Sequence, residues 1–205
     1  RAAELIRSFK QVAVDQTSSQ RRTFDLKEVT GEIVIAYQPM LRAAGVEVKV
    51  DIPDQLDFDS YPGPLGQVLG NLLTNSVVHA FEGRDRGTIG ISAQMSAAGN
   101  VTLKVTDDGC GIPQKDLARI FDPFFTTRLG KGGSGLGLSI VHNTVSGVLG
   151  GTVSVMSEKT VGTSFTICIP LIAPFRQAAK QSLQGEQLKG ANATVPGATG
   201  IVIPD

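Results

Sequence analysis

The sequence predicts an α+β fold in which helices pack on one face of a mixed, mostly antiparallel sheet. Segments with alternating apolar residues predict the strands, and the turn Ala98-Gly99-Asn100 joins two of them as an antiparallel hairpin. Longer segments with apolar residues three and four apart predict the helices. The expected strands are residues 46–52, 88–96, 101–106, 152–157 and 164–169.

Each expected helix has its own local signal. Asp25 can cap a helix that Gly45 stops. Residues 65–81 contain a run of Leu and Val without internal Pro, which predicts one continuous helix with a broad apolar face. Another long helix is expected over residues 136–149 and a short one over residues 114–119.

Composition and length exclude several classes of protein. The chain has 205 residues with 19 basic and 19 acidic side chains, so no broad electrostatic surface for nucleic acid is expected. No apolar run approaches the roughly 18 residues of a membrane span. The cysteines Cys110 and Cys168 have no framework spacing, which favours free thiols and a cytoplasmic location. Because the chain begins with Arg1, we expect a piece of a longer protein, whose upstream part could be anchored in the inner membrane.

Two amides and an imidazole form a stripe along residues 65–81. Asn71, Asn75 and His79 are spaced i, i+4, i+8 at the edge of the apolar face. Such amides are either solvated or line a pocket in which their oxygens hold a hard cation. The helical spacing alone leaves both readings open.

A glycine-rich segment, residues 132–138, runs directly into the helix expected at 136–149. Glycines before a helix N-terminus leave backbone N–H groups free to bind anionic oxygens. A dinucleotide fingerprint is excluded because residues 128–131 are not an apolar strand, and a P-loop is excluded because Gly132 follows Lys131.

Asp107 ends a strand and is followed by the loop Asp108-Gly109-Cys110-Gly111. This carboxylate either caps the turn or accepts a hydrogen bond from the amine of a planar ligand. The loop alone does not decide between the two.

Together these segments resemble the ATP-binding domain of sensor histidine kinases, within the superfamily of gyrase, Hsp90, histidine kinase and MutL. The resemblance rests on Asn71/Asn75, then DDGCGIP, FDPFFTT and GGSGLGLSIV in that order, and it covers residues 24–170. It implies a two-layer α/β sandwich of the Bergerat type, with ATP and Mg²⁺ as cofactors. Residues 1–20 then resemble the end of a dimerisation hairpin, and residues 171–205 a C-terminal linker or tail.

The resemblance also implies a role for each site residue. Asn75 would coordinate Mg²⁺, Asn71 would face the phosphates as the catalytic-site amide, His79 would lie near phosphates or ribose, and Asp107 would accept from the adenine amino group. Phe121, with Phe124 and Phe125, would anchor a lid. The other implied nucleotide-binding residues are Gly109, Gly111, Ile112, Phe121, Lys131, Gly133, Ser134, Gly135, Leu136, Gly137, Leu138 and Thr163.

The implied function is donation of the ATP γ-phosphate to a histidine in two-component signalling. Hydrolases of the superfamily usually have a Glu base where Asn71 stands, and an amide is not a base, so slow intrinsic hydrolysis is expected. The chain has two histidines, His79 and His142, both within the ATP-binding region, so the acceptor is expected on the largely absent hairpin. Expected partners are that hairpin, a second copy of the chain and a response regulator. The alternatives are a nucleotide-binding module without phosphoryl transfer and a serine kinase of the anti-sigma type.

Overall fold

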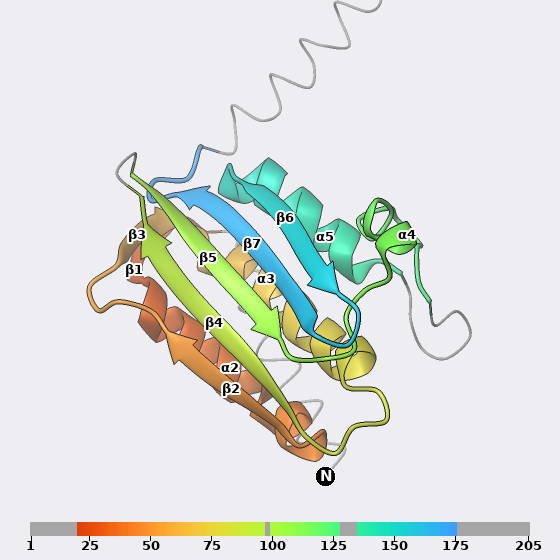
Figure 1. Ribbon diagram of the computed structural model, residues 1–205. Coiled ribbons are helices and arrows are strands. Elements are labelled where there is room, and N and C mark those ends of the chain that lie inside the picture. Colours follow the sequence, from red (N-terminus) through yellow and green to blue (C-terminus); the bar gives the residue numbers. More distant parts are fainter. Residues whose placement is uncertain (1–19, 97–98, 128–134, 176–205) are drawn as a thin grey trace, which may run out of the picture. The chain divides into compact units, whose positions relative to one another are not determined.

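The computed structural model describes residues 20–96, 99–127 and 135–175 (Figure 1). The chain divides into two compact units, Arg1–Ala173 and Pro174–Asp205, and only Pro174 and Phe175 of the second are described. The segment predicted to end a dimerisation hairpin lies outside the described residues except for Gln20, and so does most of the predicted tail.

A five-stranded sheet forms one layer of the first unit, in the order β2-β4-β5-β7-β6. β2 pairs parallel with β4, and the other neighbours are antiparallel, so the predicted mixed, mostly antiparallel sheet is confirmed. The strands are β2 (Val46–Asp51), β4 (Gly87–Met95), β5 (Asn100–Asp107), β6 (Thr152–Glu158) and β7 (Gly162–Pro170).

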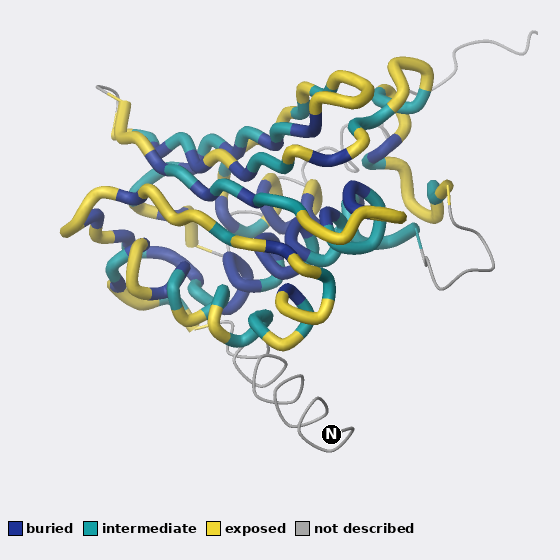
Figure 2. The backbone as a smooth tube through the Cα atoms, turned by 60° about the horizontal axis from the view of Figure 1, so that its bottom comes forward, coloured by how far each residue is buried: buried dark blue, intermediate teal, exposed yellow. Residues whose placement is uncertain are grey.

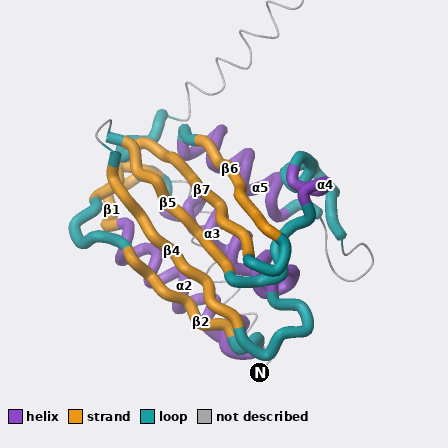
Figure 3. The backbone as a smooth tube through the Cα atoms, viewed as in Figure 1, coloured by secondary structure: helices purple, strands orange, loops and turns teal. Residues whose placement is uncertain are grey.

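Three helices form the second layer and cover one face of this sheet (Figures 1 and 3). They are α2 (Leu26–Ala43), α3 (Pro62–Asn75) and α5 (Gly137–Thr144); the short α4 (Gln114–Leu117) follows β5 and contacts β6. Buried positions gather where the helices meet the sheet, as Figure 2 shows. Leu65, Leu69 and Leu72 of α3 are among the most buried side chains there, so the apolar face predicted for this helix is its core face.

The start of α2 has the cap that its sequence predicts. The Asp25 carboxylate accepts the Glu28 amide at 2.8 Å through Oδ1 and the Leu56 amide at 3.1 Å through Oδ2. Gly45 has a φ of 66°, a left-handed conformation that glycine adopts at low cost, and this ends the helix.

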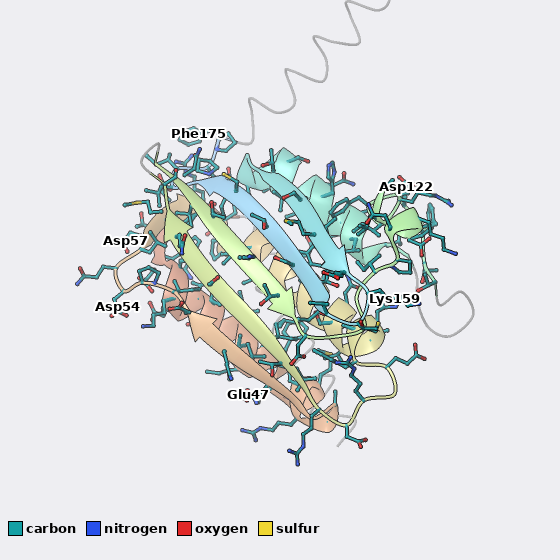
Figure 4. All side chains as sticks on the ribbon, in the orientation of Figure 1. Glu47, Asp54, Asp57, Asp122, Lys159 and Phe175 are labelled. Carbon is teal, nitrogen blue, oxygen red and sulfur yellow. The ribbon has the colours of Figure 1, made fainter. Side chains whose placement is uncertain are left out.

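A two-stranded sheet was missed by the sequence reasoning. β1 (Arg22–Asp25) and β3 (Asp57–Ser60) pair antiparallel, and Phe24 stacks on Phe58 with ring centroids 5.9 Å apart. Each strand has four residues, which is too short for alternation to stand out. Figure 4 shows Asp54 and Asp57 at the edge of this region, on the chain that leads from β2 into β3.

Two helices change their winding, which corrects the sequence prediction. The expected helix 65–81 becomes α3 followed by a π-helical turn, η1 (Ser76–Ala80), where the Phe81 amide donates to the Ser76 carbonyl at 3.1 Å. The expected helix 136–149 becomes α5 followed by a second π-turn, η2 (Val145–Leu149). A π-turn is wider than the α-helical turn of about 3.6 residues, so the predicted stripe holds through Asn75 and not as far as His79.

Candidate functional site

The side chains of Asn71 and Asn75 meet the start of α5. A methyl group placed on Gly137 would lie 3.4 Å from Oδ1 of Asn71 and 3.4 Å from Oδ1 of Asn75. The two amide oxygens therefore converge on the first residue of α5, where glycine leaves their approach open. This arrangement favours the pocket-wall reading of the Asn pair.

The side-chain amides of Asn71 and Asn75 differ in their hydrogen bonds. Asn71 Nδ2 donates to the Gln67 carbonyl at 2.9 Å, which fixes the orientation of the Asn71 oxygen. Asn75 Nδ2 is buried and has no hydrogen-bond partner among the described residues. A buried donor without a partner costs about 1–3 kcal/mol, so this amide calls for an acceptor that a ligand could supply.

The N-terminus of α5 is suited to bind an anion. Among the described residues no side chain caps it: the carbonyl of the preceding residue, Leu136, accepts the Ile140 amide and the Ser139 hydroxyl, each at 2.9 Å. Leu138 packs against the core and fixes the first turn. The positive end of the helix dipole therefore faces the same place as the two Asn oxygens.

Asp107 lies at the end of β5, and its carboxylate accepts three hydrogen bonds. Oδ1 accepts the amides of Gly109 at 3.0 Å and Thr163 at 3.2 Å, and Oδ2 accepts the Ser76 hydroxyl at 3.3 Å. Burial raises the pKa of Asp107, and these three bonds oppose that rise. Oδ2 receives only the long bond from Ser76, so among the described groups it is the oxygen better able to accept from a ligand.

The loop after Asp107 is held between η1 and the β6–β7 turn. The Cys110 amide donates to the Ala80 carbonyl at 2.9 Å, and the Thr160 amide donates to the Cys110 carbonyl at 2.8 Å. A methyl on Gly109 would lie 2.4 Å from Ala80 Cβ, and one on Gly111 would lie 2.1 Å from the Glu158 carbonyl oxygen. Neither position has room for a side chain, so glycine lets the backbone of this loop pack closely against its neighbours.

A row of polar residues crosses three strands at this end of the sheet. Asp107 pairs with Thr163, and Thr163 pairs with Ser157. The Ser157 hydroxyl also accepts the Ile112 amide at 2.8 Å. Thus Asp107, Thr163 and Ile112, which were predicted separately, belong to one connected group.

Sequence reasoning missed Ser76 and Ser157. A signal was present for Ser157, because the inward positions of three strands are apolar until this row and polar in it. In β5 the inward residues Val101, Leu103 and Val105 lead up to Asp107, and in β6 Val153 and Val155 lead up to Ser157. In the antiparallel β7 the inward residues Phe165, Ile167 and Ile169 follow Thr163. Ser76 continues the buried face of α3, three and four residues after Leu73 and Leu72, but this helical position does not reveal that its partner is Asp107 on β5.

The aromatic segment after α4 is only partly packed. Phe121 lies against the core, 6.5 Å from the Phe165 ring and 5.7 Å from the His142 ring between centroids. Phe125 also packs there, whereas Phe124 is 72% exposed. Gly135 has a φ of 68° and lies close to the backbone of Phe124.

Some predicted site residues cannot be placed. Lys131, Gly133 and Ser134 lie outside the described residues.

His79 is half-buried, and its carbonyl lies 3.3 Å from Cys110 Sγ. Both cysteines are free thiols, and Cys110 is exposed.

The donor set at the Asn pair fits a magnesium ion held together with a nucleotide. Among the described residues there is no group of three or more His, Cys, Asp or Glu side chains that could hold a metal. Mg²⁺ commonly takes one or two protein oxygens and completes its shell with water and substrate phosphates. Amide oxygens beside an anion-binding helix end satisfy that chemistry.

Comparison with known proteins identifies the family. Residues 61–173 match the family described as histidine kinase-, DNA gyrase B- and HSP90-like ATPase, and the chain belongs to it. All the residues of the site described above lie within this match, so family membership supports ATP binding here.

Two similar proteins are named as sensor histidine kinases. The chain is 32% identical over 188 residues to the sensor histidine kinase RcsC of Salmonella typhimurium, covering 88% of this chain and 19% of that protein. It is 42% identical over 115 residues to ZraS of Escherichia coli, covering 56% of this chain and 23% of that protein. The chain thus spans about a fifth of the length of these relatives.

Solved structures agree with the fold. The catalytic domain of the histidine kinase ThkA superposes with a TM-score of 0.65 at 26% identity, covering 75% of this chain and 97% of that one. Full-length ShkA in complex with AMPPNP superposes with a TM-score of 0.63 at 25% identity, covering 82% of this chain and 35% of that one. The predicted α+β fold class and the predicted resemblance to the ATP-binding catalytic domain of a histidine kinase are both confirmed. No helix in the described part of the chain is both long and apolar enough to span a membrane.

Proposed function

We propose that this chain binds Mg-ATP between α3 and α5 and presents the γ-phosphate to a histidine on a helical hairpin outside the described residues. The transfer would serve two-component signal transduction, with a response regulator as the later acceptor. Membership of the ATPase family and similarity to sensor histidine kinases support the class of activity.

One observation carries the proposal: the end of a single helix reaches both halves of the site. Asn75, the last residue of α3, approaches Gly137 at the anion-binding start of α5. The next residue, Ser76, donates to the carboxylate of Asp107 at 3.3 Å. A ligand with an amino-bearing base at one end and phosphates at the other fits this pairing.

Each group has a chemical role in such a complex. The Asp107 carboxylate would accept a hydrogen bond from the adenine amino group. The Asn75 oxygen would bind Mg²⁺, and its buried Nδ2, which has no partner in the described part of the chain, would donate to a phosphate oxygen. When bound, Mg²⁺ supplies positive charge that orients the phosphates and balances their charge.

Asn71 distinguishes transfer from hydrolysis. Its amide is fixed by the bond from Nδ2 to the Gln67 carbonyl, and an amide cannot take a proton from water at neutral pH. This position therefore supplies no base to activate water beside the bound nucleotide. This favours a slow hydrolase that retains ATP until an acceptor is positioned.

The acceptor histidine is proposed to lie outside this sequence. His79 is half-buried beside the Asp107 loop, and His142 is exposed with its ring against Phe121. Both histidines belong to the ATP-binding domain itself, His79 in η1 and His142 in α5. A homodimer joined through the hairpin is the proposed working form.

The test is labelling with γ-phosphate-labelled ATP. The 205-residue chain alone should gain no acid-labile phosphate, whereas a longer form that carries the upstream hairpin should gain it. Asn75→Ala in the longer form should remove the label. If the longer form binds ATP and stays unlabelled, the module without phosphoryl transfer is the better description; acid-stable label would favour the serine kinase.

A further inference from the structure

Ser157 joins three segments around the base-recognition end of the site. Its hydroxyl oxygen lies 2.8 Å from the Ile112 amide nitrogen, 2.8 Å from the Gly162 carbonyl oxygen and 3.0 Å from Thr163 Oγ1. These contacts come from the loop after Asp107 and from the start of β7. Ser157 is therefore placed to control groups that lie beside Asp107.

The available protons decide the direction of these bonds. The Ile112 amide can only donate and the Gly162 carbonyl can only accept, so the single Ser157 proton points to Gly162. The bond between Ser157 and Thr163 then uses the Thr163 proton. In this arrangement the Ser157 oxygen accepts two bonds and donates one, which satisfies it completely.

The consequence falls on Thr163. Its hydroxyl proton is committed to Ser157, so only lone pairs of Oγ1 remain for another partner. The Thr163 amide meanwhile donates to Asp107 Oδ1 at 3.2 Å, which keeps the two residues side by side in the register. The row thus offers two acceptors, the Thr163 hydroxyl and the Asp107 carboxylate, to one ligand edge.

We propose that Ser157 is a positioning residue that locks the Thr163 hydroxyl as an acceptor and thereby makes the site select a purine with an amino group at C6 over one with a carbonyl at C6. The proposal rests on the proposed function, because it assumes that the base of ATP lies against this row. At C6, adenine presents an amino donor and guanine presents a carbonyl acceptor. When the C6 position of the base faces this row, fixed acceptors disfavour guanine, because its C6 carbonyl then meets acceptors and finds no donor in the row.

The test compares binding of ATP and GTP by calorimetry in matched variants. Ser157→Ala frees the Thr163 hydroxyl to turn and donate, so the preference for ATP over GTP should fall about tenfold, the order of one net hydrogen bond. Ser157→Thr keeps the hydroxyl and should keep the preference. Ser154→Ala is the control, because Ser154 is exposed on the opposite face of the same strand and should change neither affinity.

Thr163→Val separates positioning from general stability. It removes the hydroxyl that Ser157 is proposed to orient, so adding Ser157→Ala to it should change the ATP-to-GTP ratio no further. If Ser157 had only a structural role, Ser157→Ala would lower thermal stability and weaken the binding of ATP and of GTP by the same factor, with or without Thr163→Val. That result would overturn the proposal. If Ser157→Ala does not fold, Ser157→Cys, with its weaker hydrogen-bonding sulfur, takes its place.

The wild-type titrations separate this inference from the proposed function. Equal affinity for ATP and GTP would refute selection by the acceptor row and leave nucleotide binding intact. No binding of either nucleotide would refute the proposed function and the inference with it. A strong preference for ATP that Ser157→Ala reduces and Ser157→Thr retains is the result expected.

Discussion

Gly137→Ala separates the stability of the domain from its binding of nucleotide. The added methyl would lie 3.4 Å from each Asn oxygen and 3.6 Å from Asn75 Nδ2, which is ordinary van der Waals contact. Alanine is favoured over glycine within helices by up to about 1 kcal/mol, and less at a first residue such as this. The variant should therefore be as stable as the wild type or more so, by up to about 2–4 °C in melting temperature.

The same methyl should block the site. It would cover the oxygens of Asn71 and Asn75 and the first turn of α5, where the phosphates are proposed to lie. Losing one hydrogen bond to a charged group costs about 1.5–3 kcal/mol, which corresponds to a loss of roughly 10- to 100-fold in ATP affinity. The expected result is a protein that melts no lower and binds ATP much more weakly.

The assay is thermal unfolding and calorimetry on the same sample, with Gly31→Ala as the matched control. Gly31 lies within α2, and a methyl there meets no atom within 4 Å among the described residues. The control should gain stability and keep full ATP affinity. Wild-type affinity in a stable Gly137→Ala protein would refute the placement of phosphates between α3 and α5.

Three further results are expected. Asp107→Asn should weaken ATP and ADP by the same factor in calorimetry, since both contain adenine, and weakening of ATP alone would refute the role of Asp107. Burial raises the pKa of Asp107 above its ordinary 3.8, so ATP affinity should fall as the pH drops through that raised value. Over the same range the contribution of this group to folding stability changes in the opposite sense: it is full below pH 3.8 and is lost as the pH rises through the raised pKa. An ATP affinity with no such pH dependence would contradict the need for a charged Asp107. Thr30 Oγ1 is buried with no hydrogen-bond partner among the described residues, so Thr30→Val should raise the free energy of unfolding by about 1 kcal/mol in denaturant titration; a decrease would show that the hydroxyl is satisfied.

Much of the sheet was predictable because its residues alternate over long strands. β4 and β5 have nine and eight residues, and their ends differ from prediction by at most one residue. α2 was equally clear, because Asp25 and Gly45 mark both of its ends. β1 and β3 were missed because four-residue strands carry too little pattern, and only their pairing makes them visible.

The candidate site was predictable where chemistry lies in a local motif. Asn71, Asn75, Asp107 and the glycines near them were found because amides, a carboxylate and flexible backbone recur at a spacing that resembles a known family. Ser76 was missed because its partner, Asp107, lies on β5, and a helical pattern does not show which strand residue the helix packs against. Contacts between strands were hidden for a related reason, since register is a property of pairs and not of one segment.

The most direct measurement is a calorimetric titration of ATP into the wild type and Asn75→Ala, each with Mg²⁺ and with a chelator. We expect the wild type to bind Mg-ATP and to lose affinity when the metal is removed. Asn75→Ala should bind weakly in both conditions, because it lacks the amide oxygen and the buried Nδ2 that has no partner in the described part of the chain. Wild-type affinity and metal dependence in Asn75→Ala would contradict the central claim that this amide holds Mg-ATP.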